Sequence, residues 1–244
     1  MARSSSNPDA RVRWFHSRRF CLRSGDAPDL GRASGDSGFV AHLSYSTHGA
    51  TGWDWSFRLL RKGEGWSFVH DSRLTLFLDE PGQYVPLDAK TGDMVAVRMP
   101  RARENLYPNR FTLHGGQGGP VVGNGFIKYF VPIRYETAST LVDAFSGKWA
   151  DSLRFGLSVM NSPLDFERAD AAVVDVGPDD EPGIIRLLET FVKQHPKALA
   201  PSRGVPFGTE AGPAGFPRAR AHGRADLADG YGWRRSHEGA SDKD

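Results

Sequence analysis

Apolar positions recur with the period of a helix at two places in the second half of the chain. The first stretch, 137–145, and the second, about 182–195, each carry one apolar stripe, and Pro182 suits the first turn of a helix. The stripes consist of Ala138, Leu141, Val142 and Phe145 in the first stretch and Ile184, Leu187, Leu188, Phe191 and Val192 in the second. The pattern therefore predicts two amphipathic helices that face a core.

Shorter apolar runs, several of them alternating with polar residues, predict strands before, between and after these helices. The predicted strands cover residues 66–69, 74–78, 94–99, 126–133, 153–159 and 171–176. After residue 125 the order is β-α-β-β-α. We therefore predict an α+β fold, in which a small antiparallel β-rich N-terminal unit precedes a mixed sheet with both helices on one face.

Changes in local composition divide the chain into five segments. Residues 1–50 are polar and cationic and predict a partly ordered basic segment, and residues 51–114 predict a small β-rich domain. Six glycines between His114 and Phe126 favour a linker over 115–125. An α+β domain at 126–237 and a disordered tail at 238–244 complete the expected organisation.

Composition excludes several classes of protein. The 244 residues include 31 Lys and Arg against 29 Asp and Glu, so the chain lacks the cationic field of a dedicated nucleic-acid binder. Its single cysteine, Cys21, cannot form an intramolecular disulfide, which fits a reducing compartment. No apolar run approaches the roughly 20 residues of a membrane span, and no secretory signal is present. We expect a cytoplasmic protein with no nucleic-acid or membrane partner.

The usual signatures of hydrolases and metal enzymes are missing from the sequence. It contains no Gly-x-Ser-x-Gly, His-x-x-x-His or Cys-x-x-Cys motif, so we expect neither a metal site nor a cofactor. Cations do lie on or beside the predicted strands of the second half, and converging arginines bind phosphate bidentately. These cations are Lys128, Arg134, Lys148, Arg154, Arg168 and Arg235. Scattered solvated charges are the alternative interpretation.

Several short segments resemble the HopA effector-like family of bacterial proteins. They are the Trp-rich start at 52–60, the runs 95–100 and 128–133, the segment 155–163, the run 168–174 and the Tyr-Gly-Trp-Arg-Arg segment within 230–235. The family is similar to phosphothreonine lyases and supplies the lyase half of kinase–lyase pairs in lanthipeptide or thioamitide biosynthesis. There, an aminoglycoside-phosphotransferase-like kinase phosphorylates Ser or Thr of a precursor peptide, and the lyase eliminates phosphate to leave a dehydro amino acid.

The resemblance implies roles for particular residues. Lys128 and Arg168 match cations that contact phosphate, and Arg235 matches a C-terminal arginine; Arg134 is a further candidate for phosphate binding. Three positions depart from the family pattern. They are Ser158 in place of the base lysine, Phe130 in place of the acid histidine and Asp175 in place of a tyrosine.

The departure at Ser158 separates the functional hypotheses. An alcohol cannot remove a Cα proton at neutral pH without an activating partner, so Arg154, Lys148 or a histidine such as His222 is needed to supply the missing group. We therefore take Arg154, Ser158 and Lys148 as the candidate catalytic set of a phosphoserine or phosphothreonine lyase. The alternatives are a catalytically degenerate subunit of a hetero-oligomer, which binds phosphopeptide or leader peptide or scaffolds the kinase, and a type III secreted effector-like protein.

Overall fold

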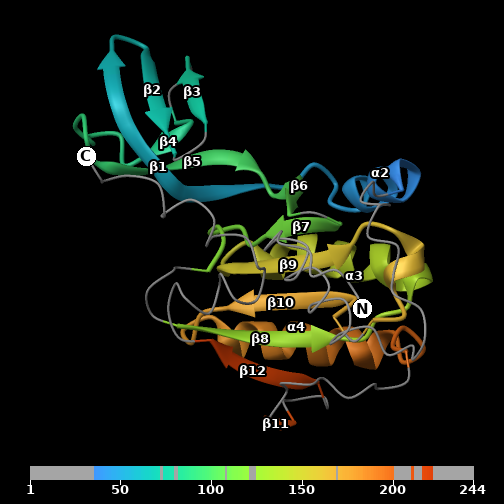
Figure 1. Cartoon of the computed structure of the whole chain (residues 1–244). Coiled ribbons are helices and arrows are strands. Elements are labelled where there is room, and N and C mark those ends of the chain that lie inside the picture. Colours follow the sequence, from blue (N-terminus) through green and yellow to red (C-terminus); the bar gives the residue numbers. More distant parts are fainter. Residues whose placement is uncertain are drawn as a thin grey trace, which may run out of the picture.

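The residues that the structure describes form two antiparallel sheets and three α-helices (Figure 1). The computed structural model describes residues 36–71, 74–79, 82–107, 109–120, 125–168, 170–200, 210–211 and 216–221. Arg235, His222, Cys21 and the tail at 238–244 lie outside the described residues, as does the basic segment up to residue 35. Within the described part, no helix combines the length and the apolar character needed to cross a membrane.

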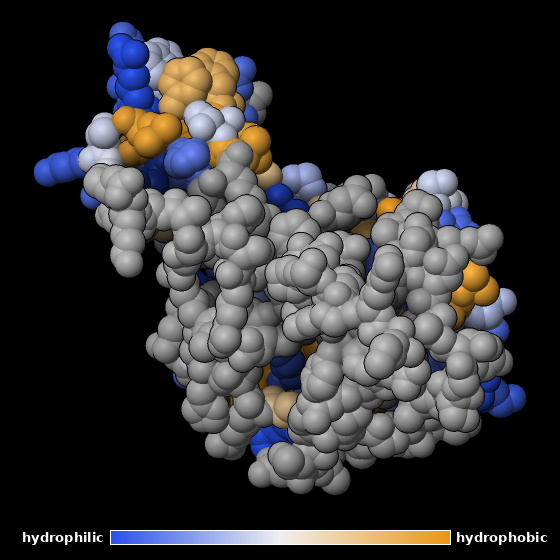
Figure 2. All heavy atoms as spheres, viewed as in Figure 1, coloured by the Kyte–Doolittle hydropathy of each residue, from blue (hydrophilic) through white to orange (hydrophobic). Residues whose placement is uncertain are grey.

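The smaller sheet has the strand order β3-β2-β1-β5-β4. Its strands are β1 (Thr51–Gly63), β2 (Trp66–His70), β3 (Thr75–Leu78), β4 (Tyr84–Val85) and β5 (Met94–Pro100). One side of this sheet carries a small core of its own that includes Phe57, Leu59, Val69, Val95 and Val97. Part of the other side is a row of aromatic rings. The ring centroid of Phe68 lies 5.7 Å from that of Trp66 and 5.2 Å from that of Phe77. Figure 2 shows apolar side chains exposed on the lobe that this sheet forms.

The larger sheet has the order β11-β12-β8-β10-β9-β7-β6. Its strands are β6 (Ala102–Tyr107), β7 (Arg110–His114), β8 (Phe126–Val131), β9 (Phe155–Met160), β10 (Ala172–Val176), β11 (Glu210–Ala211) and β12 (Pro217–Ala221). The helices are α2 (Ser37–Tyr45), α3 (Ala138–Ser146) and α4 (Glu181–Gln194), with short 3₁₀ turns at Tyr135–Thr137, Lys148–Ala150 and Pro163–Asp165.

The α+β class is confirmed, although the larger sheet is not mixed. All pairings between its described strands are antiparallel. The connection from β8 through α3 does return the chain in a parallel direction to β9. However, β10 lies between these two strands and is antiparallel to both. β8 and β9 are therefore parallel to each other but do not pair, because each of them pairs with β10 in the antiparallel direction.

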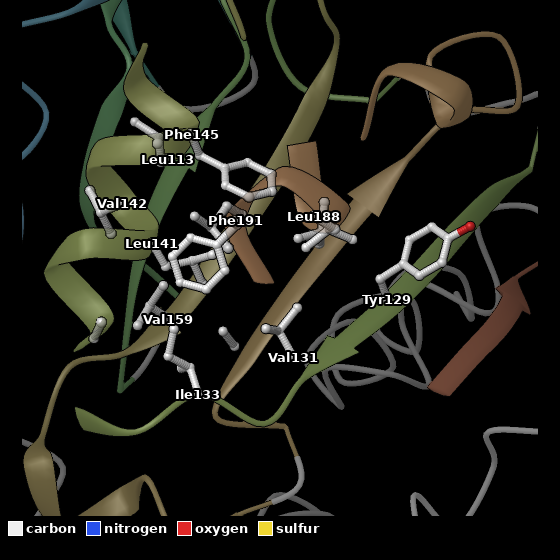
Figure 3. Close-up of a cluster of buried hydrophobic side chains, with 14 of the residues drawn as sticks. Leu113, Tyr129, Val131, Ile133, Leu141, Val142, Phe145, Val159, Leu188 and Phe191 are labelled. Atoms are coloured by element: carbon white, nitrogen blue, oxygen red, sulfur yellow. The ribbon is translucent and has the colours of Figure 1, made fainter. Parts of the chain in front are cut away.

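Both predicted helical stripes face the main core. The buried residues of α3 are Ala138, Leu141, Val142 and Phe145, and those of α4 are Ile184, Leu188 and Phe191. Figure 3 shows these helices directing Phe145 and Phe191 toward Val131 and Val159 of the sheet. Because the inward positions of β8 and β9 alternate, α3 and α4 cover one face of the larger sheet (Figure 1). The opposite face carries the even-numbered residues of β7, β8 and β9, and it is where the candidate site lies.

The boundary between the two sheets differs from the sequence prediction. Residue 114 was expected to end the β-rich unit, whereas β6 and β7 pair into the larger sheet, so the sheets divide near Arg101. The described part of the expected linker is firmly attached: the Gly115 and Gly116 amides donate to the carbonyls of Phe155 and Ala150 at 2.9 and 3.0 Å. Residues 115–118 therefore form a tight turn against the start of β9.

Candidate functional site

The face of the larger sheet opposite α3 and α4 has a central row of four residues from four strands. Thr112 lies opposite Ser158, Ser158 opposite Val173, and Val173 opposite Phe130. Their side chains are directed away from the helices, yet all four residues are at most 7% exposed. Along the strand direction, one ion-paired group lies on each side of this row. Each group includes a cation that the sequence analysis named as a candidate.

On one side of the central row, two arginines share one carboxylate. Arg168 donates through Nε to Oδ1 of Asp170 at 2.8 Å and through Nη2 to Oδ2 at 3.0 Å. Arg110 donates through Nη2 to the same Oδ2 at 2.6 Å and to the Asp170 carbonyl at 3.1 Å. Strand β7 supplies Arg110, whereas the loop before β10 supplies Arg168 and Asp170. Two guanidinium groups thus share the single carboxylate of Asp170.

Two polar side-chain atoms on this side of the sheet face have unused hydrogen-bonding capacity. Arg110 Nη1 and Thr112 Oγ1 are buried and have no hydrogen-bond partner among the described residues. They belong to residues two apart on β7, so both side chains lie on the same face of the sheet. Leaving a buried donor unsatisfied typically costs about 1–3 kcal/mol, which makes this position suited to a ligand that supplies the missing acceptor.

Asp165 lies close enough to both arginines to be influenced by their charges. Burial raises the pKa of its carboxyl, while Arg168 and Arg110 lower it and Asp170 raises it further. The net direction is upward, so the protonated form of Asp165 is favoured more than in water. Nothing in the described geometry places this carboxyl against a leaving group.

On the other side of the central row, Lys128 Nζ contacts Asp175 Oδ1 at 2.8 Å, and both side chains are nearly buried. Lys128 also lies 4.9 Å from the ring centroid of Phe126. The carboxylate of Asp175 offsets the charge of the lysine. Lys128 and Arg168 are separated by the central row, because their partners Asp175 and Asp170 lie five residues apart along the chain, on either side of Val173. One phosphate cannot bridge them.

The remaining candidates do not converge on Ser158. Arg154 precedes β9, and its guanidinium lies 5.4 Å from the Trp55 ring of the smaller sheet. Four residues of extended chain separate it from Ser158 by about 13 Å. Lys148 is exposed in the 3₁₀ turn after α3. Arg134 is exposed and donates through Nε to the Leu199 carbonyl at 3.2 Å. The structure therefore does not bring Arg154, Ser158 and Lys148 together as a catalytic set.

Sequence reasoning missed Arg110, Asp170 and Thr112. A local signal existed in Arg-Phe-Thr-Leu-His, the sequence of β7, whose alternation places Arg110, Thr112 and His114 on one face. Pairing with Asp170, 60 residues away, is a tertiary feature that no local pattern reveals.

His114, at the end of β7, lies at the junction of the two sheets. A small hollow of about 10 Å³ is lined there by Asp54, Arg101, Arg103 and His114, among others. Arg103 Nη2 contacts Asp54 Oδ2 at 2.8 Å. Burial, followed by the charge of Arg103, lowers the pKa of His114 to about 4, while Asp54 opposes that shift. The imidazole is therefore neutral at physiological pH.

We expect the free energy of unfolding to fall as the pH drops from 7.5 to 5. His114 has a pKa of about 4 in the folded chain and about 6.5 when unfolded, so between these values the unfolded state binds more protons. The contribution of this residue amounts to at most about 2 kcal/mol over that interval. Urea unfolding at the two pH values measures it. In His114→Gln the difference between the two pH values should shrink; an unchanged difference would assign it to other groups.

Comparison with known proteins does not assign the chain to a family. No protein family model matches its sequence, and no curated protein matches it either. The resemblance to the HopA effector-like family therefore remains a prediction, and the functional argument depends on the geometry of the site.

Proposed function

We propose that this chain is the phosphopeptide-binding subunit of a cytoplasmic kinase–lyase-like pair that acts on Ser or Thr of a precursor peptide. The observation that carries the proposal is the pair Arg110 and Arg168, whose guanidinium groups converge on the single carboxylate of Asp170. Planar guanidinium groups match the geometry of phosphate oxygens, and an unsatisfied donor on Arg110 adds capacity for a further oxygen. The resemblance at 168–174 supports the same assignment.

Binding without elimination fits the site better than a lyase reaction. In the elimination, a base removes the Cα proton, the Cα–Cβ double bond forms and the Cβ–O bond breaks to release phosphate. Ser158 would need an activated hydroxyl for this, yet its neighbours across the strands are Val173 and Thr112. The contacts of Ser158 therefore support phosphate binding better than they support an elimination that uses Ser158 as its base.

Replacing Arg168 by lysine should weaken binding of a phosphothreonine peptide by about tenfold or more. Lysine keeps the charge but loses the two-pronged geometry, and hydrogen bonds to charged groups contribute about 1.5–3 kcal/mol each. Fluorescence anisotropy with labelled phosphothreonine, phosphoserine and unphosphorylated versions of one peptide measures the effect. Arg186→Lys serves as a matched control, because Arg186 is exposed on α4 and belongs to the helix-covered side.

The same samples distinguish binding from elimination. After incubation with the phosphopeptides, with and without a kinase encoded beside this chain, mass spectrometry should detect no loss of phosphoric acid. Phosphate-dependent binding without that mass loss supports the proposal. Elimination by the wild type that Ser158→Ala abolishes would restore the lyase hypothesis, and equal affinity for phosphorylated and unphosphorylated peptides would refute phosphate recognition.

A further inference from the structure

The carboxylate of Asp170 is held in the way that a phosphate would be held. Three guanidinium N–H groups from two arginines converge on its two oxygens at 2.6–3.0 Å. The Arg168 contact is bidentate, with one nitrogen on each oxygen, a geometry that carboxylates and phosphates share. The Asp170 side chain is only 4% exposed, so water does not compete strongly for these donors.

We propose that Asp170 occupies the phosphate position in the ligand-free chain and that the incoming phosphate monoester displaces it. This inference rests on the function proposed above and adds how the site is regulated. Asp170 acts as an internal competitor for the two guanidinium groups and holds them in place. A ligand with more negative charge and more oxygens then replaces it.

The unsatisfied donor on Arg110 supports this exchange. A carboxylate has two oxygens, whereas a phosphate monoester has three non-bridging oxygens. Asp170 engages both of its oxygens and still leaves Arg110 Nη1 buried without a partner among the described residues. The hydroxyl of Thr112, two residues along β7, is also buried without a partner. A third oxygen at this position would satisfy one or both groups, so the donor set fits phosphate better than it fits Asp170.

Charge explains why Asp170 has to leave. Arg110 and Arg168 supply two positive charges, which a phosphate dianion balances by itself. Retaining the Asp170 carboxylate beside the dianion would place like charges together in a site shielded from water. Breaking the contacts between Asp170 and the arginines therefore lowers the affinity of the wild type for the phosphopeptide. Asparagine has nearly the same shape but no charge, and it should compete less for the two guanidinium groups.

Asp170→Asn should bind a phosphothreonine peptide at least tenfold more tightly than the wild type. Isothermal titration calorimetry on the full chain measures the affinity, and thermal unfolding establishes that the variant is folded. Asp175→Asn is the matched control, because it removes the same charge from the same face of the sheet beside Lys128. Its affinity should change by less than threefold. An equal gain in both variants would indicate a general field effect and would overturn the exchange.

A measurement on the wild type keeps the inference testable if Asp170→Asn does not fold. The carboxyl ¹³C resonance of Asp170 should shift on saturation with the phosphothreonine peptide, because the residue loses its guanidinium partners; an unchanged resonance in the bound state would overturn the exchange. Failure of the wild type and Asp170→Asn alike to bind the peptide would overturn the proposed function too. Arg168-dependent binding by the wild type without a gain in folded Asp170→Asn would overturn the exchange alone.

Discussion

Replacing Arg101 by leucine is expected to lower the free energy of unfolding by about 4 kcal/mol. Arg101 is 1% exposed, and its guanidinium joins three parts of the chain. It donates to the His114 carbonyl at 2.8 Å, to the Phe145 carbonyl at 2.7 Å and to Asp151 Oδ1 at 3.0 Å. The substitution would leave the buried Phe145 carbonyl and the part-buried His114 carbonyl without their donor, which costs more than the hydrogen bonds themselves contribute.

The position of Arg101 explains the size of this effect. The Phe145 and Ser146 carbonyls belong to the last turn of α3, where helix carbonyls lack partners and the helix dipole favours a cation. Burial lowers the pKa of Arg101, and the charge of Asp151 partly opposes this shift. The residue therefore connects the end of the smaller sheet, the end of α3 and the end of β7.

Urea unfolding of Arg101→Leu measures the loss, and Arg98→Leu provides the control. Arg98 lies on the adjacent strand β5, is exposed and donates to Thr51 Oγ1 at 3.1 Å. Because exposed polar contacts contribute little, Arg98→Leu should stay within about 0.5 kcal/mol of the wild type. A loss below about 1 kcal/mol for Arg101→Leu would show that water replaces its contacts.

Gly115→Ala is expected to destabilise the protein by about 3 kcal/mol through direct collision. A Cβ at this position would lie 2.1 Å from the Leu153 carbonyl oxygen. Relief requires a shift of backbone that the Gly115 amide itself holds through its hydrogen bond to the Phe155 carbonyl at 2.9 Å. The substitution therefore strains the start of β9 as well as the turn.

Thermal unfolding compares Gly115→Ala with Gly177→Ala, which makes the same chemical change in open space. No atom lies within 4 Å of a Cβ built at Gly177. That variant should remain as stable as the wild type or gain up to about 1 kcal/mol, because alanine restricts the unfolded chain. Equal losses in both variants would attribute the effect of Gly115→Ala to backbone entropy instead of contact.

The sequence predicted the parts of the fold that depend on local periodicity. The stripes of α3 and α4 and the apolar runs of β8, β9 and β10 correspond closely to the observed elements. Strand pairing is less accessible, because an apolar run does not specify its neighbour. This is why β7 was grouped with the smaller sheet, and why β10 between β8 and β9 was not anticipated.

The site was predictable only in part for the same reason. Alternation along a strand assigns Ser158 to a face of the sheet, but it cannot reveal that Thr112 and Val173 flank this residue. The resemblance singled out Arg168 but not its partner Asp170, because that ion pair depends on how the loop before β10 folds. Glycine content suggested flexibility at 115–118, whereas only the contacts of Gly115 and Gly116 show how tightly that turn packs.

The strand order has a consequence for dividing the protein into pieces. A fragment covering residues 126–237, the second domain expected from composition, would keep Arg168 and Asp170 but would lack Arg110 and Thr112 on β7. It would also expose one edge of β9, whose six residues are all buried in the whole chain. Such an unprotected edge favours pairing with other chains. The fragment should therefore aggregate where the intact protein does not, and it would lack one of the two arginines of the site.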